Sequence, residues 1–314
     1  MKILIFGSSG LLGDAFNRVL KDHHEVHTKT HAEVDVSNSS YVCDVINNIR
    51  PDVVLNCAAV VGGLYSQINH PANYLTNNVS ITDGLYNGLM LSQHKCITYN
   101  FLSTCVYPKT ASYPLTPDQI EDGPPHGSNK SYSLAKRLQL TYADAFWSEY
   151  QISSCNITLG NLFGLGDHFS DPLNAHVIPA LFIKFLSALK NGDSSVELLG
   201  NGEPLREFLF ADDAALIISS ALLSDRQTSI LKDAPPSHFL LSNHSEISIK
   251  DLAFIVRQTC KACDVDILWG QVSDPGQLRK PSISSDVFQP FLSQFRPIEH
   301  ALAEIYSHLI RVGY

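Results

Sequence analysis

The chain has 314 residues, of which 44% are hydrophobic and 17% charged, so it can bury the core of one large or two modest domains. Its formal net charge of −9 argues against a nucleic-acid binder, which would rely on clustered Lys and Arg. No apolar run approaches the roughly 18 residues that cross a bilayer, and the N-terminus lacks signal-peptide features. Seven scattered cysteines are typical of thiols in a reducing compartment. We therefore expect a cytoplasmic protein with neither a membrane nor a nucleic acid as its partner.

Short apolar runs alternate with segments of helical period through the first half of the chain. In chain order, we predict a strand at 2–6, a helix at 11–20, strands at 25–28 and 52–57 around a helix at 41–49, and a helix at 71–91. A strand at 97–103, a helix at 132–150 and a strand at 153–158 follow. This alternation predicts an α/β fold with a Rossmann-type, doubly wound parallel sheet. The strands lack polar alternation, so both faces of the sheet should be covered.

Beyond about residue 161 the pattern changes, because Gly and Pro become denser and the regular alternation is lost. We expect a smaller α/β substrate domain that is interleaved with the first. The predicted Rossmann domain comprises residues 1–160 and about 207–240. The predicted substrate domain comprises about 161–206 and 241–314.

A glycine-rich turn follows the first predicted strand and opens the first predicted helix, with the sequence Gly7-Ser8-Ser9-Gly10-Leu11-Leu12-Gly13. Glycines at this spacing allow a tight turn and a close approach of the backbone to a pyrophosphate. The helix N-terminus supplies N–H groups and a favourable dipole. An ordinary glycine-containing turn could share this pattern, but its place directly after an N-terminal strand favours dinucleotide binding.

The end of the second predicted strand selects between NAD and NADP. A carboxylate there would bind the ribose 2′-hydroxyl, whereas a basic residue would bind a 2′-phosphate. The strand runs into Lys29, with His31 close by and no carboxylate at its tip. Lys29, assisted by Ser9 and His31, is therefore our candidate phosphate ligand, and the cofactor we expect is NADP(H). The alternative for Lys29 is an exposed surface lysine.

A Y-x-x-x-K motif, Tyr132 to Lys136, lies on the helix predicted at 132–150. Residues four apart share a helix face, so the Lys136 ammonium can stabilise a Tyr132 phenolate and also hold the nicotinamide ribose. Ser103, at the end of a predicted strand, can donate a second hydrogen bond to the same carbonyl oxygen. Together with the glycine turn, these three residues indicate a reductase that exchanges a proton between Tyr132 and a carbonyl.

Two further residues could carry acid–base chemistry. Cys105 lies two residues beyond Ser103, and His176 opens a predicted helix. A thiol and an imidazole can move protons at carbons next to a ketone. Taken singly, Cys105 could equally be a small buried hydrophobe and His176 a helix-capping or core histidine.

At these residues the sequence resembles the GDP-L-fucose synthase family of extended short-chain dehydrogenase/reductases. The resemblance covers nearly the whole chain and is most specific in two segments, Ser103-Thr104-Cys105-Val106-Tyr107-Pro108-Lys109 and His176-Val177-Ile178-Pro179-Ala180-Leu181. Further matching segments are 58–64, 123–126, 161–164, 199–208 with Asp212 and Asp213, and Gly276-Gln277-Leu278-Arg279-Lys280.

The resemblance implies a role for each matching residue. Ser103, Tyr132 and Lys136 would be the reductase triad, and Cys105 and His176 the acid and base of 3,5-epimerisation. The remaining cofactor contacts would come from Ala58, Ala59, Leu102, Asn161, Leu162, Gly164 and His176, beside the glycine turn and Lys29. The GDP-sugar substrate would contact Lys184, Leu199, Arg206 and Lys280. The resemblance implies no metal site, and it implies a homodimer in which the helices at 71–91 and 132–150 form the contact.

The sequence departs from the family pattern near the expected base and sugar contacts. Leu159-Gly160 precede Asn161 where the family usually has Pro-Thr, Leu199 replaces a common Trp, and Lys184 replaces a common Arg. Two alternatives therefore stay open: a reductase or epimerase for a related GDP-4-keto sugar (a heptose or dideoxy sugar), and a non-catalytic NADP-binding regulator. Separately, Cys260 and Cys263 form a C-x-x-C, for which we expect a helix with two apolar-facing thiols rather than a zinc or redox site.

Overall fold

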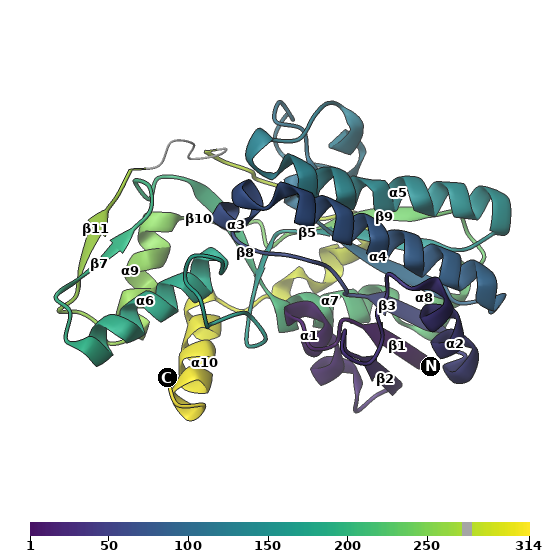
Figure 1. The fold of residues 1–314 in the computed structure, drawn as a ribbon, viewed down its shortest axis with the longest axis horizontal. Coiled ribbons are helices and arrows are strands. Elements are labelled where there is room, and N and C mark those ends of the chain that lie inside the picture. The colour runs from purple at the N-terminus through teal and green to yellow at the C-terminus, as the bar shows by residue number, and fades with distance from the viewer. Residues whose placement is uncertain (272–277) are drawn as a thin grey trace.

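The computed structural model describes residues 1–271 and 278–314. At its centre is a six-stranded sheet with the order β2-β1-β3-β4-β5-β9, in which each neighbouring pair runs parallel (Figure 1). The strands are β1 (Lys2–Phe6), β2 (Glu25–Lys29), β3 (Val53–Asn56), β4 (Ile97–Ser103), β5 (Ser154–Leu159) and β9 (Ser237–Leu241). The predicted Rossmann-type sheet is confirmed: β1 to β5 begin and end within two residues of the predicted positions, and β9 is an additional strand that was not predicted.

Helices cover both faces of this sheet (Figure 1). One layer contains α2 (Ser39–Ile49), α4 (Pro71–Ser92) and α5 (Lys130–Tyr150), with the short α3 (Leu64–Asn69) before α4; the other contains α1 (Leu11–Leu20) and α7 (Ala211–Leu222). Strand β1 shows why polar alternation is missing. Ile3 and Ile5 pack in the cluster under α1 and α7, whereas Leu4 and Phe6 pack in the cluster under α2 and α4. Burial on both faces requires apolar residues at every position.

The second part of the molecule is built around a separate hydrophobic cluster. It contains a three-stranded sheet, β10-β8-β6, and a two-stranded sheet, β11-β7. Their strands are β6 (Asn161–Phe163), β7 (Ser195–Leu198), β8 (Leu205–Phe210), β10 (Glu246–Ser248) and β11 (Asp266–Trp269), and the helices are α6 (Val177–Asn191), α9 (Ile249–Thr259) and α10 (Ile298–Arg311). In Figure 1, β7, β11, α6 and α9 form the left end of the molecule, β8 lies near its middle, and β2 lies in the right half.

The chain crosses between the two clusters more than once. On β8, Phe208 and Phe210 face the second cluster while Leu209 faces the first. Helix α8 (Asp225–Lys232) then packs against β4 and β5. The 3₁₀ segment η4 (Asp286–Gln294) also returns to the first cluster through Phe288, although the sequence places 241–314 in the substrate domain. No local sequence pattern predicts that Phe288 packs against a cluster formed by residues far away in the chain.

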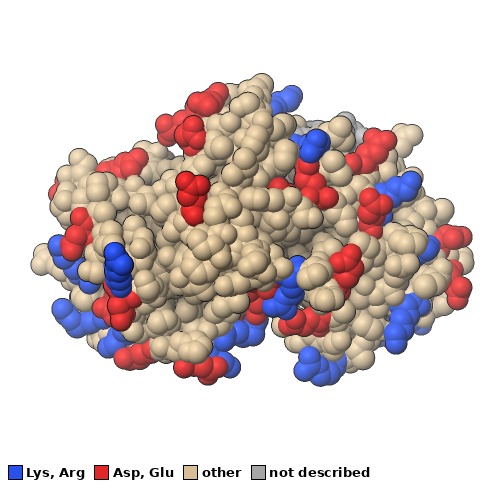
Figure 2. All heavy atoms as spheres, turned by 180° about the vertical axis from the view of Figure 1, so that it is seen from behind, with Lys and Arg blue, Asp and Glu red and all other residues tan. Residues whose placement is uncertain are grey.

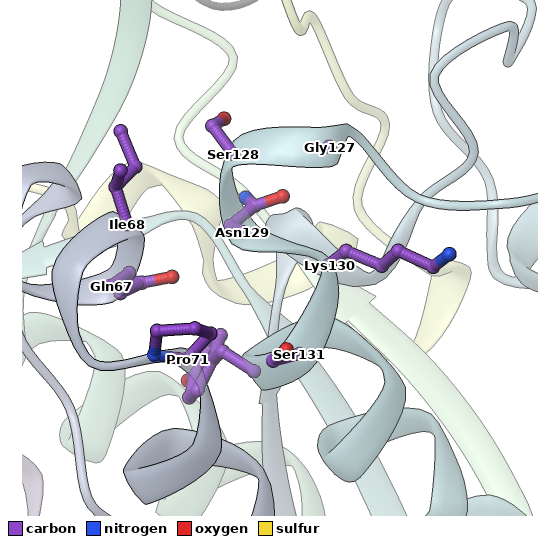
Figure 3. Close-up of a pocket in the computed structure, with 9 residues that line it drawn as sticks. Gln67, Ile68, Pro71, Gly127, Ser128, Asn129, Lys130 and Ser131 are labelled. Carbon is purple, nitrogen blue, oxygen red and sulfur yellow. The ribbon is translucent and has the colours of Figure 1, made fainter.

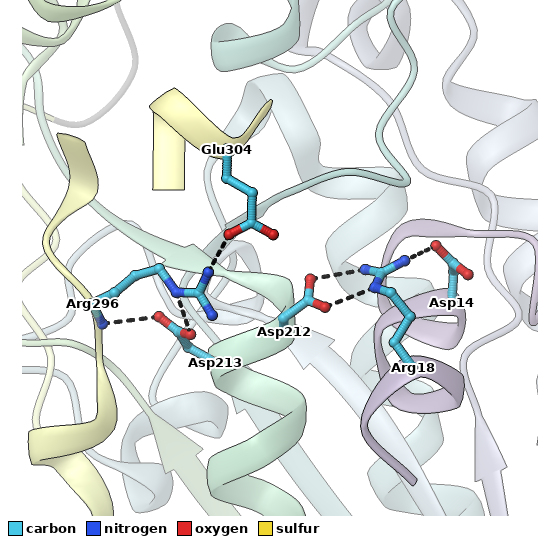
Figure 4. Close-up of polar contacts among 6 residues, drawn as sticks. All are labelled: Asp14, Arg18, Asp212, Asp213, Arg296 and Glu304. Atoms are coloured by element: carbon cyan, nitrogen blue, oxygen red, sulfur yellow. Dashed lines mark hydrogen bonds and ion pairs between the residues drawn. The ribbon is translucent and has the colours of Figure 1, made fainter. Parts of the chain in front are cut away.

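A chain of ion pairs joins the two parts (Figure 4). On α1, Arg18 contacts Asp14 and donates to both carboxylate oxygens of Asp212 at 2.7 and 2.8 Å. The adjacent Asp213, whose side chain is 3% exposed, accepts from the Arg296 side chain at 2.8 Å. Arg296 precedes α10, pairs with Glu304 and lies 4.5 Å over the Phe210 ring. Consecutive aspartates on α7 thus hold α1 on one side and α10 on the other.

The surface and the cysteines test other expectations. On the face shown in Figure 2, acidic and basic side chains are interspersed. Within residues 1–271 and 278–314, no helix has the length and apolar character to span a membrane.

The expectation that Cys260 and Cys263 lie on one helix as two apolar-facing thiols is wrong, because α9 ends at Thr259. Cys260 is buried in the second cluster and Cys263 is exposed. No cluster of potential metal ligands occurs in the described part of the chain.

Replacing Arg296 by Met should leave the buried Asp213 carboxylate without its guanidinium partner. Removing one member of a largely buried pair costs about 3 kcal/mol, so the free energy of unfolding should fall by that amount in urea titrations. Lys95→Met is the control, because the Lys95–Asp233 pair is 74% and 68% exposed and should contribute less than about 1 kcal/mol. Equal effects of the two substitutions would contradict the role assigned to the Asp213–Arg296 pair.

Candidate active site

The glycine turn is constrained by close packing at two of its glycines. Gly7 has a φ of 72°, and a Cβ there would lie 2.7 Å from the backbone nitrogen of Ala58. A Cβ on Gly13 would lie 2.3 Å from the Gly7 carbonyl oxygen. The Gly7 and Ser8 N–H groups donate to the Lys29 carbonyl at 2.9 and 3.2 Å. The turn is therefore locked between the ends of β2 and β3.

The start of α1 fits the pyrophosphate of a dinucleotide. Gly10 is its N-cap and has no side chain, so within the described residues the first N–H groups of the helix receive no capping hydrogen bond from an N-cap side chain. Leu12 and Leu102 are 8% and 3% exposed, with their side chains in hydrophobic clusters. Any cofactor contact from these two residues would come from the main chain. Ser9 is exposed beside them.

Lys29 lies at the end of β2, opposite Phe6 of β1. Its ammonium is 3.8 Å from a Glu33 carboxylate oxygen. Glu33 accepts from the Thr30 N–H and hydroxyl, both at 2.8 Å, and these bonds and then Lys29 hold the pKa of the carboxyl below its usual value. The expectation of no carboxylate at this strand tip is therefore wrong, because the turn after β2 folds Glu33 back onto Lys29.

The end of β4 and the start of α5 are held together by side chain to main chain bonds. The Ser133 hydroxyl donates to the Cys105 carbonyl at 2.8 Å, and Arg137 donates to the carbonyls of Val106 and Gly123 at 2.6 and 2.7 Å. Ser103 caps the 3₁₀ turn η1 (Thr104–Val106) by accepting from the Cys105 N–H at 3.3 Å. This brings Ser103 and Cys105 to the first two turns of α5, which carry Tyr132 and Lys136.

Tyr132 and Lys136 are both deeply buried, at 7% and 3% exposure. Burial raises the pKa of the Tyr132 phenol, and the Cys105 thiol and Tyr74 raise it further. The expected stabilisation of a Tyr132 phenolate by Lys136 is therefore wrong, and Tyr132 is held as a proton donor. Burial lowers the pKa of Lys136 to about 8, an effect that Cys57 partly opposes. The Tyr74 ring meets the Tyr132 ring edge-on, with centroids 6.3 Å apart. A buried ammonium and phenol on one helix face are the groups that carbonyl reduction requires.

His176 is the N-cap of α6, as the sequence predicts for a residue that opens a helix. The segment before it packs against the loop after β3: the Gly63 N–H donates to the Asn174 carbonyl at 2.9 Å, and a Cβ on Gly63 would lie 2.4 Å from the Ala175 carbonyl oxygen. A Cβ on Gly62 would lie 2.2 Å from the Tyr74 hydroxyl oxygen. His176 is thereby anchored, through this loop and Tyr74, to the Tyr132 side of the site.

Two of the predicted substrate residues gather near Cys105. Burial lowers the pKa of Arg206 and of Lys280, and in both cases the Cys105 thiol opposes the effect. By contrast, the Lys184 ammonium donates to the Glu197 carbonyl on β7, and Leu199 is 59% exposed just beyond that strand. Asn161 donates to the Glu207 carbonyl at 2.9 Å, and Leu162 packs on the first cluster. Gly276 and Gln277 lie outside the described residues.

Sequence reasoning missed two features of the site. The first is a cavity of about 190 Å³ between α3 and the start of α5, lined by Gln67, Asn129, Tyr132 and six others (Figure 3). The side-chain oxygens of Gln67 and Asn129 are buried there without a partner among the described residues. The second is Asp167, whose carboxylate oxygen lies 3.6 Å from His176 Nδ1. Both depend on segments that meet only in the fold.

Comparisons with known proteins agree with this geometry. Residues 3–230 match the NAD dependent epimerase/dehydratase family. The chain belongs to this family. The GDP-L-fucose synthase of Dictyostelium discoideum is 28% identical over 311 residues, which are 96% of this chain and 93% of the relative. The GDP-L-colitose synthase of Yersinia pseudotuberculosis is 31% identical over 219 residues, 68% of this chain and 70% of the relative.

Solved structures place the same fold over almost the whole chain. A GDP-L-fucose synthetase from Naegleria fowleri is 25% identical, with a TM-score of 0.82 over 99% of this chain and 93% of that chain. A structure of a Naegleria fowleri GDP-L-fucose synthetase bound to NADP is also 25% identical, with a TM-score of 0.78 over the same shares. The described sheet and glycine turn are thus those of an epimerase/dehydratase family member.

In this family member, Gly13→Ala should disrupt the turn even though Ala is normally favoured over Gly in a helix. The added Cβ would overlap the Gly7 carbonyl, so we expect a loss of about 1–3 kcal/mol in unfolding free energy and at least about tenfold weaker NADPH binding, measured by fluorescence titration. Gly127→Ala is the control, because a Cβ there would meet no atom within 4 Å in the described part of the chain. Unaltered NADPH binding by Gly13→Ala would contradict this account of the turn.

Lys136 predicts a pH-dependent stability. Its folded pKa of about 8 lies below the ordinary value of 10.5, so between these pH values the unfolded chain binds a proton that the folded chain does not. Stability should therefore rise with pH across this window. The gain in unfolding free energy produced by Lys136→Met should shrink by about 3 kcal/mol from pH 7 to pH 10.5. A gain that stays constant across these pH values, in urea titrations, would show that Lys136 is not a destabilising buried ammonium.

Proposed function

We propose that this chain catalyses the NADPH-dependent 3,5-epimerisation and 4-reduction of GDP-4-keto-6-deoxy-D-mannose, which forms GDP-L-fucose. The observation that carries the proposal is the junction of β4 and α5, where the Ser133 hydroxyl donates to the Cys105 carbonyl at 2.8 Å on the helix that bears Tyr132 and Lys136. Ser103 and Cys105 come from the end of β4, Tyr132 and Lys136 from α5, and His176 from the start of α6. The named GDP-L-fucose synthases that align over nearly the whole chain support the same substrate.

The residues around the glycine turn fit NADP(H), and a relative of known structure is bound to NADP. The N-terminus of α1 and the close packing of the glycines suit the pyrophosphate. Lys29 suits the 2′-phosphate, provided that its ammonium leaves the Glu33 carboxylate, 3.8 Å away, and binds the phosphate instead. When bound, NADPH supplies the hydride that reduces carbon 4. Tyr132 donates its phenolic proton to the oxygen on that carbon, Ser103 donates a second hydrogen bond, and Lys136 holds positive charge beside the phenol.

Epimerisation uses the other two groups. The 4-keto group acidifies the protons on carbons 3 and 5. When one of these C–H bonds breaks, its electron pair passes to the carbonyl oxygen, where Tyr132 and Ser103 stabilise the enolate. Cys105 and His176 act from opposite faces, one removing the proton and the other returning one, which inverts the carbon. Burial keeps the Tyr132 phenol protonated for this stabilising role.

The diphosphate of the substrate is assigned to Arg206 and Lys280. Both are partly buried basic side chains near Cys105, so they can neutralise an anion although the chain carries a net charge of −9. Arg279 is already engaged by Glu246, with Nε to Oε2 at 3.0 Å. The Lys184 ammonium must leave the Glu197 carbonyl before it can join this group.

A second candidate function is reduction or epimerisation of a related GDP-4-keto sugar. Leu199 is 59% exposed, and a GDP-L-colitose synthase matches two thirds of the chain. A non-catalytic regulator is opposed by the retention of all five chemical groups.

We also propose that the protein is cytoplasmic and forms a homodimer. The dimer contact would use α4 and α5, because these long helices pack side by side and expose Leu75 and Leu134 at 38% and 41%.

The proposal predicts that Cys105→Ser abolishes solvent-deuterium exchange at carbons 3 and 5 of GDP-4-keto-6-deoxy-mannose, because a serine hydroxyl is too weak an acid and base to replace the thiol. NMR of the recovered sugar measures exchange, and NADPH absorbance measures reduction. Cys263→Ser, which changes an exposed thiol, is the control and should match the wild type. Exchange at wild-type rates in Cys105→Ser would refute the epimerase assignment. NADPH oxidation without exchange in the wild type would favour a simple reductase.

A further inference from the structure

Asp167 is a buried acidic residue at the edge of the proposed site. Its side chain is 4% exposed, and its Oδ1 atom lies 3.6 Å from His176 Nδ1. The same oxygen accepts from the His168 N–H at 2.9 Å. The other oxygen, Oδ2, is buried and has no hydrogen-bond partner within residues 1–271 and 278–314. A carboxylate with so few hydrogen-bond donors is poorly solvated. Proteins usually pair a buried carboxylate of this kind with a cationic group.

The turn that carries Asp167 is held against the cofactor helix. A Cβ on Gly164 would lie 3.1 Å from Leu11 Cδ1, and a Cβ on Gly166 would lie 3.2 Å from Leu11 Cα. The Asp167 N–H donates to the Gly164 carbonyl at 3.3 Å. The position of the carboxylate is therefore fixed by packing against α1, independently of the segment that anchors His176.

His176 needs such a partner because of its place in the fold. As the N-cap of a fifteen-residue helix, it lies at the positive end of the α6 dipole, where a nearby negative charge is favoured. Its side chain is 37% exposed, so one edge of the ring can meet a substrate while Nδ1 faces Asp167. A carboxylate on this side offsets the dipole and fixes which nitrogen carries the exchangeable proton.

We propose that Asp167 is a positioning residue that holds His176 with its Nδ1–H toward the carboxylate and Nε2 toward the sugar. The inference rests on the proposed function of His176. When the imidazole takes a proton from carbon, the C–H electron pair passes to the enolate, the proton bonds to Nε2, and the resulting imidazolium is paired with Asp167. When it returns a proton, the Nε2–H bond breaks and neutral imidazole is restored. The 3.6 Å distance must shorten by a few tenths of an ångström, as catalytic hydrogen bonds do when substrate binds.

The first test separates epimerisation from reduction. Asp167→Asn keeps the volume and removes the charge, so we expect exchange at the carbon served by His176 to fall at least tenfold. NADPH binding should stay within about twofold, because the substitution keeps the volume of the side chain that packs beside α1. Reduction should continue, so the product should shift from the epimerised sugar toward unepimerised 6-deoxy sugar. A general structural defect would lower binding, exchange and reduction together.

Asp171→Asn is the matched control. It makes the same change in the same loop, at an exposed side chain that accepts from the Leu173 N–H at 2.9 Å and the Asn174 amide at 2.6 Å. It should leave the product ratio unchanged. An Asp167→Asn enzyme with the wild-type ratio would overturn the inference, as would an Asp171→Asn enzyme with an equal shift.

A second measurement does not depend on turnover. With ¹⁵N-labelled histidine, the His176 ring signals, identified by their loss in His176→Gln, should report Nδ1–H in the wild type and a mixed or Nε2–H tautomer in Asp167→Ala. An unchanged tautomer would overturn the inference. If the wild type exchanged neither proton, the proposed function would fail, and this comparison would still decide whether Asp167 orients His176.

Discussion

The close packing around the first turn of α1 is the constraint on which the rest of the site depends. Gly7 lies against Ala58, Gly13 against Gly7, and Gly164 and Gly166 against Leu11, in each case with no room or almost no room for a side chain. Three segments that are distant in the sequence, 7–13, the loop at Ala58 and 164–166, can therefore meet at one helix terminus. The same helix extends into the Arg18–Asp212 pair, and through Asp213 and Arg296 into α10. The cofactor turn and the substrate part of the molecule thus share a rigid connection.

The protein carries a net negative charge, but basic side chains lie near the proposed site. An acidic chain that handles an anionic nucleotide-sugar would repel its ligand through its overall field, so attraction has to come from buried basic groups at short range. Arg206 and Lys280, both partly buried, are the groups proposed for this role, and the burial that lowers their pKa values would also strengthen their pairing with a phosphate. Burial also lowers the pKa of Lys136, to about 8. These residues lower the stability of the empty protein, which is a usual feature of sites built for a charged ligand.

The side chains proposed for reduction and for epimerisation come from different segments of the chain. The reductase groups are fixed by the β4–α5 junction, where Ser133 and Arg137 bind the main chain around Cys105. The imidazole is fixed by α6, whose approach is set by Gly62 and Gly63. Asp167 comes from a third segment that rests on α1. Reduction therefore depends on one junction, whereas epimerisation requires three separately anchored segments to meet.

The sequence by itself determined the sheet, the glycine turn and the Y-x-x-x-K helix, because hydrophobic period and helical spacing are local properties. It also placed His176 at a helix start. Only the tertiary structure decided that Glu33 folds back onto Lys29, that Asp167 faces His176, that Lys184 binds the Glu197 carbonyl and that Phe288 returns to the first cluster. Each of these depends on segments that approach through packing. The spacing of residues in the sequence cannot predict these contacts, because the side chains come together only when the two hydrophobic clusters form.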